Sequence, residues 1–547
     1  MMKKTGLFIC ILLLICNIEL FAQGNEIDAY ILSNTELSGT ARSVAMAGAF
    51  GSLGGDISVI SHNPAGLGIY RSSEISGTMD LSTNKTSTNW DNISWDQNKT
   101  RFTLSNFGFE LYFPTSSDGV PNWNLGFSYN RVKNFNRKYG MSNNGLDFSM
   151  ADYVAWRASN AFGHGRGIPE DDLKYIEGVY DPFDNRALAG HWLPVLGYES
   201  GMYGNMVGED GLYHSAFGKK TGNDWNIHSP NQMRLSVNES GQMGEYNVGF
   251  GMNISNFLFL GASLSMTDIK YKYSSFYEEY FVYDNTKNDE LYLENRLNTE
   301  GSAVSVNVGA IINMQILRLG VAYNSPRWYN MTDYYDARAR TYINGYPTPE
   351  FNAFVPENSY SEYKFSTPGK WLFSGSVILG TSALISADYE LVNYKDMYFS
   401  SRDEYGDGVN YDANGYIDDD YTWSKTLKAG VEVKVTSQFA VRAGYMMQTS
   451  PVREALSNND VEVLPAGTIP HFTVTSKPTN YYTAGLGYRF TPNFYMDMAC
   501  VYRQEKSDAY AFSNTYNEAG TAADVVSKPA TLQSNTTRIV LTLGYKF

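Results

Sequence analysis

Residue types that carry out chemistry in enzymes occur in this sequence, but they are not arranged for catalysis. The six histidines, at positions 62, 164, 191, 214, 228 and 471, are scattered, and none has the spacing of a metal-ligand set. The patterns H-E-x-x-H, G-x-x-x-x-G-K-[ST] and G-x-S-x-G, which mark zinc, phosphate and serine-hydrolase sites, do not occur. We therefore predict no catalytic residues, no metal site and no cofactor.

One stretch gathers carboxylates in a way that resembles a calcium loop. The segment SRDEYGDGVNYDANGYIDDDY carries seven acidic side chains, at Asp403, Glu404, Asp407, Asp412, Asp418, Asp419 and Asp420. Its spacing fails the EF-hand template, because Asp412-x-Asn414 is followed at once by Gly415. The pattern favours a solvated, self-repelling surface loop, which could still bridge divalent ions at a lipopolysaccharide surface.

The start of the chain and its charge indicate where the protein works. Residues 1–22 have the three parts of a secretory signal peptide: two lysines, an apolar run over 7–15 and a cleavage point after Ala22. Removal of this signal would leave Cys500 as the one cysteine, so no internal disulfide is predicted. A net charge of −15 and the lack of a basic stripe argue against nucleic acid as a partner.

The last ten residues, RIVLTLGYKF, alternate strictly between two faces. The odd-numbered residues from Ile539 to Phe547 are apolar, whereas the even-numbered ones include Arg538, Thr542 and Lys546. The same alternation recurs over 427–435, 439–445 and 482–490. A soluble β-sandwich also alternates, but polar residues opposite Val and Leu, with an aromatic carboxy-terminus, are typical of a lipid-facing wall around a wet lumen. The terminal Phe resembles the signal by which outer-membrane barrels meet their assembly machinery.

Counting such segments predicts fourteen strands. Tight turns alternate with long polar excursions, which places the turns in the periplasm and the excursions outside. On this rule 232–254 must be one strand, kinked around Gly241 and Gly244, which gives the even number that a single-chain bacterial barrel requires. The predicted fold is all-β, a 14-stranded antiparallel transmembrane β-barrel over 73–547, with a long extracellular loop at 135–231. The strands are expected at 73–83, 101–113, 122–134, 232–254, 256–271, 301–314, 316–326, 369–380, 382–395, 422–436, 438–449, 480–490, 493–505 and 536–547.

An empty barrel of this size would leak, so a plug is expected in its lumen. Residues 23–72 are the one substantial segment outside the strand register, and we predict that they form this N-terminal plug, or hatch. Within it, ISVISHNPAGLGI ends an apolar run at a cluster of turn formers. Asn63 before Pro64 favours an extended or turn conformation, and two glycines follow. The local prediction is a rigid bend with a flexible exit.

The segment ELSGTARSVAMAGAFGSLGGDISVISHNPAGLG resembles the plug region of the outer-membrane long-chain fatty-acid transporter family (FadL/TodX type). The resemblance implies a plug whose Asn63-Pro64-Ala65 bend lies against a kinked strand and takes part in gating. It also implies that hydrophobic substrate lands among the outer loops, passes into a pocket, and leaves sideways through the wall when the plug moves. Gly126, in NWNLGFSYN, is our candidate for the wall position beside the bend, since a strand glycine often marks a close backbone approach.

The loop at 135–231 contains helical patches with apolar faces. Leu188, Trp192, Leu193 and Leu196 are the residues that we predict to contact substrate, although a loop packed only on itself is an equal alternative. A haem-type receptor or adhesin that uses the long loops is a second interpretation, and an outer-membrane lipid-modifying enzyme is a third. The interpretation that we adopt is a monomeric channel for hydrophobic small molecules in the outer membrane of a Gram-negative bacterium. Its partners would be the ligand, the bilayer, lipopolysaccharide and the assembly machinery.

Overall fold

The computed structural model describes residues 24–547 except 164, 208–211, 222–223, 228, 285–286, 345–348, 358, 402–410 and 517–522. The predicted signal peptide at 1–22 and the first part of the acidic loop, with Asp403, Glu404 and Asp407, lie outside the described residues.

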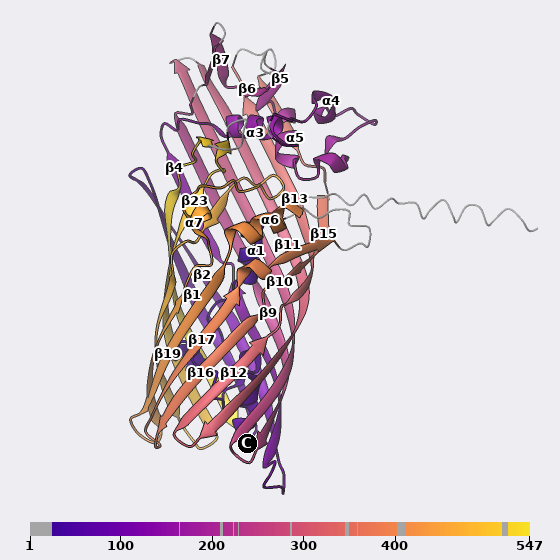
Figure 1. Cartoon of the computed structure of the whole chain (residues 1–547). Helices are drawn as coiled ribbons and strands as arrows, with labels where there is room; N and C mark the ends of the chain where they lie inside the picture. Colours follow the sequence, from indigo (N-terminus) through magenta and orange to yellow (C-terminus); the bar gives the residue numbers. More distant parts are fainter. Residues whose placement is uncertain are drawn as a thin grey trace, which may run out of the picture.

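Fourteen antiparallel strands close into one barrel (Figure 1). Each wall strand pairs with the next along the chain, and the last pairs with the first, from Glu74↔Lys546 to Asn89↔Thr531. The predicted strand number and fold class are confirmed, and 232–254 is one strand, in which Gly241 has a φ of 121°. The wall strands are β1 (Glu74–Trp90), β2 (Ile93–Pro114), β3 (Asn122–Asn134), β9 (Gln232–Ile254), β10 (Leu258–Asp284), β11 (Lys287–Met314), β12 (Leu317–Asn324), β16 (Lys370–Leu379), β17 (Ala383–Asn393), β19 (Trp423–Lys434), β20 (Phe439–Gln448), β22 (Thr479–Arg489), β23 (Phe494–Tyr510) and β26 (Ala530–Lys546).

The two faces of the wall differ as the sequence alternation predicts. In β26, Ile539, Leu543 and Tyr545 face outward and are 44–49% exposed, whereas Val540 and Thr542 face the lumen and are fully buried. An apolar outer face and a polar inner face are what a lipid-embedded barrel requires. No helix among the described residues is long and apolar enough to cross a membrane.

Changing Tyr545 and Phe547 to Asp is expected to lower the amount of membrane-inserted barrel about fivefold, because a charge on the lipid face of a closing strand is unfavourable. Tyr545 pairs with Ile75 of β1 and with Phe494 of β23, so the change acts at the seal of the barrel. Heat-modifiable migration on gels measures the folded fraction. Unchanged levels would argue against a membrane role for this strand.

The wall extends far beyond the predicted strand ends. The strands β10 and β11 contain 27 and 28 residues, about 90 Å at roughly 3.3 Å per residue. The strand prediction left 272–300 and 327–368 as polar loops, which is wrong. Strands β10 and β11 continue through 272–300, and three further strands prolong the wall: β13 (Trp328–Tyr342), β14 (Glu350–Phe354) and β15 (Ser359–Ser366). Their outward residues, such as Lys270, Lys272 and Arg338, are polar, so these segments lack the alternation that marks a lipid-facing strand.

The described residues of the segment 135–231 lie at the end of the barrel opposite the C-terminus, where most of them form a cap (Figure 1). The first element of the segment, β4 (Arg137–Asn143), pairs with β9 and prolongs the wall beyond β3. The cap itself contains α3 (Met150–Ser159), α4 (Glu170–Leu173), η3 (Pro182–Asp184), η4 (Arg186–Leu188), α5 (Trp192–Glu199), β5 (Tyr203–Val207), β6 (Tyr213–Ser215), β7 (Gly218–Thr221) and β8 (Asp224–Ile227). Smaller elements complete the rim: η5 (Tyr394–Asp396), β18 (Tyr398–Ser401), α6 (Tyr411–Asp420), α7 (Glu454–Ser457), β21 (Phe472–Val474), β24 (Thr515–Tyr516) and β25 (Ala523–Val525).

The N-terminal segment lies inside the barrel and contacts both sides of the wall. It consists of α1 (Glu26–Ser33), α2 (Ala41–Ala45), η1 (Ile57–Ser61) and η2 (Pro64–Ile69). Helix α2 packs on β20, β22, β23 and β26, while η2 packs on β3, β9, β10 and β11. Each element begins at a residue whose side chain caps it: Asn25, Thr40, Asp56 and Asn63. We refer to residues 24–70 as the plug.

Candidate functional site

The Asn63-Pro64-Ala65 bend is the start of a 3-10 helix. Asn63 Oδ1 accepts a hydrogen bond from the Ala65 amide at 3.2 Å, and Pro64 takes the first helical position, where a missing N–H costs nothing. Asn63 Nδ2 donates to the Gly51 carbonyl at 2.6 Å, so the same side chain ties two parts of the plug together. This arrangement explains why the sequence places turn formers at this point.

A ring of wall glycines lets the plug backbone approach the barrel closely. At each of them, an added Cβ would come within 3.0 Å of a plug atom, so a larger side chain would have to displace the plug. The members of this glycine ring lie on nine strands, from β2 to β22. They are Gly108, Gly126, Gly249, Gly251, Gly261, Gly309, Gly320, Gly430, Gly444 and Gly485.

The bend itself does not lie at Gly126. Pro64 and Ala65 press on Gly261 of β10, and Asn63 Oδ1 presses on Gly309 of β11. Gly126 instead receives Ile60 and Leu67, the apolar side chains on either side of the bend. The expected contact between Pro64 and Gly126 is therefore wrong, because β9 separates β3 from β10 in the wall and its own Gly249 and Gly251 also meet Leu67.

On the opposite side of the lumen the plug is held by charged and polar contacts. The Arg42 guanidinium donates to both Glu432 carboxylate oxygens, at 2.9 and 3.1 Å. Arg538 Nη1 donates to the Leu37 carbonyl at 2.6 Å, and Arg503 pairs with Glu36 at 3.0 Å. Charge-assisted bonds of this kind are stronger than neutral ones when desolvated. The plug is therefore attached to β19, β23 and β26 by charged hydrogen bonds, in addition to its close packing on the glycine ring.

The wall has a seam where β3 leaves β2. Their pairing ends at Asn106↔Asn130, and beyond it β3 shifts register between Arg131 and Lys133 while pairing with β9 alone. The described pairing of β2 over 93–105 is with β1 only. Side chains bridge the gap: Lys99 Nζ donates to the Glu239 carbonyl at 2.7 Å, and Arg101 Nη1 to that of Gly241 at 3.1 Å. We call residues 99–105 and 131–134 the β2–β3 seam.

The plug is hydrogen-bonded to this seam through residues 31–37. The Glu36 amide donates to the Val132 carbonyl at 2.8 Å, and the Asn134 amide donates to Glu36 Oε2 at 3.3 Å. Lys133 Nζ also donates to the Ile31 carbonyl. Residues 31–37 are thus the part of the plug that bonds to β3 at its register shift, while the 3-10 helix that begins at the Asn63-Pro64-Ala65 bend packs on β9, the strand that contains Gly241.

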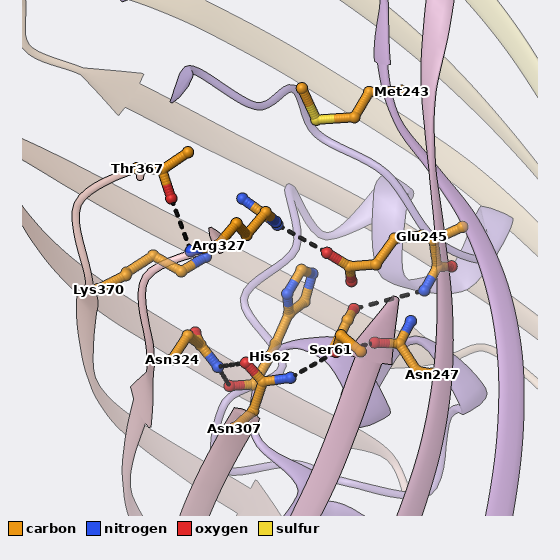
Figure 2. A network of polar contacts seen from close by, with 12 residues as sticks. Ser61, His62, Met243, Glu245, Asn247, Asn307, Asn324, Arg327, Thr367 and Lys370 are labelled. Atoms are coloured by element: carbon orange, nitrogen blue, oxygen red, sulfur yellow. Dashed lines mark hydrogen bonds and ion pairs between the residues drawn. The ribbon is translucent and has the colours of Figure 1, made fainter. Parts of the chain in front are cut away.

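A polar cavity of about 80 Å³ lies beside the bend. Figure 2 shows His62 within its network, where Asn324 Nδ2 donates to the His62 carbonyl at 3.3 Å and to Asn307 Oδ1 at 2.9 Å. Arg327 Nη2 donates to Glu245 Oε2 at 2.7 Å across the same space. Burial, followed by the nearby Lys428 and Lys370 cations, lowers the pKa of His62 to about 3. His62 is therefore neutral at physiological pH.

The predicted substrate contacts in the cap lie in its packed interior. Leu188, Trp192, Leu193 and Leu196 are at most 1% exposed, and the Trp192 ring meets Phe183 and Tyr335 edge-on, each at 5.8 Å. An apolar groove lies elsewhere on the rim, where Phe148, Trp156, Tyr213 and Val525 line a cavity of about 330 Å³. We call it the rim groove. Sequence reasoning missed it, because residues 148–160, 212–215 and the pair Asp524 and Val525 are brought together only by the fold.

Among the described residues, no group of three or more His, Cys, Asp and Glu side chains is placed to hold a metal ion. A family model described as outer membrane protein transport protein (OMPP1/FadL/TodX) matches residues 243–547. No curated protein sequence matches the chain significantly.

Three solved structures match the chain over nearly its whole length, each with a TM-score below 0.5. A Pseudomonas aeruginosa FadL homologue matches with a TM-score of 0.49 and 11% identity over 94% of this chain and 99% of its own. The P. putida toluene transporter TodX has a TM-score of 0.46 and 11% identity, covering 94% of this chain and 99% of its own. The Ralstonia pickettii toluene transporter TbuX has a TM-score of 0.43 and 10% identity, covering 93% and 98%.

Proposed function

The chain belongs to the outer membrane protein transport family (OMPP1/FadL/TodX), and on this premise we propose that its substrate leaves sideways into the bilayer through the β2–β3 seam. The protein is a channel for hydrophobic compounds in the outer membrane of a Gram-negative bacterium. The proposed steps are capture at the cap, movement of the plug and exit through the wall.

Capture is assigned to the rim groove. Its lining is mostly apolar and aromatic, and it opens at the extracellular end, where a hydrophobic molecule arriving from outside meets the protein first. Trp156 lies on α3 and Val525 on β25, so the groove is formed by two segments of the rim that are far apart in sequence. The residues that we now expect to contact substrate first are Phe148, Trp156 and Val525.

The observation that carries the proposal is the contact between the plug and the seam. Backbone groups in a bilayer must be hydrogen-bonded, so a strand that leaves its neighbour at membrane depth needs another partner. Glu36 and Lys133 supply bonds on the lumen side, while Phe102 and Leu104, 64% and 52% exposed, face the lipid at the same level. Movement of 31–37 would remove these bonds and free the part of β3 beyond its register shift, residues 131–134.

Replacing Asn63 and Pro64 by Ala is expected to leave the barrel inserted in the membrane. Uptake of a radiolabelled long-chain fatty acid and of toluene should each fall about tenfold. The reason is that a buried hydrogen bond contributes roughly 1 kcal/mol to stability, and a buried carbonyl left unpaired costs more. Loss of the Asn63–Gly51 bond would leave the two parts of the plug moving separately. Cells lacking the protein set the background, and heat-modifiable migration checks insertion. Uptake at the wild-type rate would mean that the bend is only a turn.

A further inference from the structure

Two polar cavities lie along the same two wall strands, the upper one bordered by plug residues 33–38 and 61–62 and the lower one by Arg42, Gly55 and Asp56. The upper one, of about 80 Å³, includes Lys428 of β19 and Gln448 of β20. The lower one, of about 220 Å³, includes Glu432 and Lys434 of β19 and Arg442 of β20. All of these side chains belong to the lumen-facing set, which alternates along each strand. The two cavities therefore share one strip of the barrel wall.

One rung of the wall separates them. Gly430 and Gly444 pair directly across β19 and β20, between Lys428↔Met446 above and Glu432↔Arg442 below. An added Cβ at Gly430 would lie 2.7 Å from Met46 Cβ, and one at Gly444 would lie 2.6 Å from the Ala47 amide nitrogen. Met46 and Ala47 are fully buried and apolar. An apolar constriction between two wet spaces can stop ions by excluding water.

The chemistry of the cavities indicates what would pass if this rung opened. Together they are lined by eight basic side chains and six acidic ones. Among the described residues, the basic side chains of this lining that form no ion pair are Lys434 and Arg489, so the excess positive charge lies at the lower cavity. In the upper cavity Asn324 is 8% exposed, and its Oδ1 has no hydrogen-bond partner among the described residues, so it needs a water molecule or another donor. The strip is thus wet and favours anions.

We propose that β19 and β20 line a second, hydrophilic path through the barrel for small inorganic anions, closed by the contact of Met46 and Ala47 with Gly430 and Gly444. The wall strands of this path, β19 and β20, are distinct from β2 and β3 of the seam, although plug residues 35–37 border both the upper cavity and the seam. At this seal Met46 packs in an apolar cluster with Phe50, Leu53 and Val59, and Ala47 belongs to another cluster with Val44 and Met446. At Gly126, outside this strip, Ile57, Ile60, Leu67 and Tyr70 form a separate apolar cluster.

The test is ion conductance of purified, full-length protein in planar bilayers with a KCl gradient. Wild-type protein should be closed. Gly430→Val should raise the conductance at least tenfold, with a reversal potential shifted toward the equilibrium potential of chloride. Adding Lys434→Glu to Gly430→Val should shift the reversal potential toward that of potassium. Gly126→Val lies outside this strip and meets the ends of the Ile60 and Leu67 side chains, so it should conduct at least tenfold less than Gly430→Val.

Two further variants keep the test decisive. Gly375→Val places its Cβ 3.7 Å from the nearest atom, outside the glycine ring, and should stay closed. If Gly430→Val fails to insert, Ala47→Val acts from the plug side, because a β-branched residue is disfavoured at the φ of 54° found there. Inserted variants that stay closed, or equal conductance in Gly126→Val, would overturn the proposal. Hydrophobic uptake by the same proteins reports on the seam independently.

Discussion

Removal of residues 23–62 is expected to turn the closed barrel into a pore for small hydrophilic solutes. The wall pairs with itself all the way round, so it should insert without the plug. The deletion strips α1, α2 and η1 from the glycine ring and leaves the polar lumen of a fourteen-stranded barrel open. Swelling of liposomes in a sugar solution should accelerate about a hundredfold, as expected for an unplugged porin-like lumen.

The control for this deletion is Arg42→Gln with Glu432→Gln, which removes one anchor but keeps the plug. It should leak far less than the deletion, because Arg538, Arg503 and the glycine ring still hold the segment. An inserted deletion variant that does not conduct would show that residues 24–62 are not the closure of the lumen, and the plug model would be wrong.

The second large effect is expected at the seam. Thr103 lies on the part of β2 beyond its pairing with β3, and its Oγ1 is buried without a hydrogen-bond partner among the described residues. Thr103→Trp would fill the space through which substrate is proposed to leave. We expect uptake of a long-chain fatty acid to fall at least tenfold, while binding to whole cells at the rim groove is retained.

The matched control is Leu104→Trp, one residue along the same strand. Leu104 faces the lipid and is 52% exposed, so an indole is tolerated there, at a level where aromatic side chains are common. Uptake should remain near the wild-type rate. Equal loss in both variants would indicate a general defect of β2, and no loss in Thr103→Trp would place the exit elsewhere.

The transmembrane part of the fold could be predicted from sequence, because lipid imposes a strict alternation on every strand. The carboxy-terminal residues 538–547 show this most clearly, and β26 follows the predicted faces to Lys546. Above the membrane the rule no longer applies. In β11, the outward residues Glu294, Arg296 and Asn298 are as polar as those of a loop, and the strand was missed there although it continues to Lys287.

The candidate site was only partly predictable, for a different reason. The turn at Asn63 and Pro64 is a local property of the sequence, and it formed as a capped 3-10 helix. The wall residues that contact this turn depend on which strands are neighbours in the barrel, which the sequence does not show. Gly261 and Gly309 therefore look like any other strand glycine, and the sequence-based prediction named Gly126. Trp192 illustrates the same limit, because an apolar helix face looks alike whether it binds ligand or packs into the cap.

The measurement that tests the account most directly is photocrosslinking of a diazirine-bearing fatty acid to wild-type protein in outer membranes. Fatty acid dissolved in the bilayer will label lipid-facing residues all round the barrel. Peptide mapping distinguishes these residues from labelled residues that face the lumen. We predict attachment at the lumen-facing seam residues Lys99, Arg101 and Thr103, with none at Glu432, Lys434 and Arg442 in the lower cavity. Attachment at the lower cavity without any at the seam would contradict lateral exit and show passage straight through the barrel.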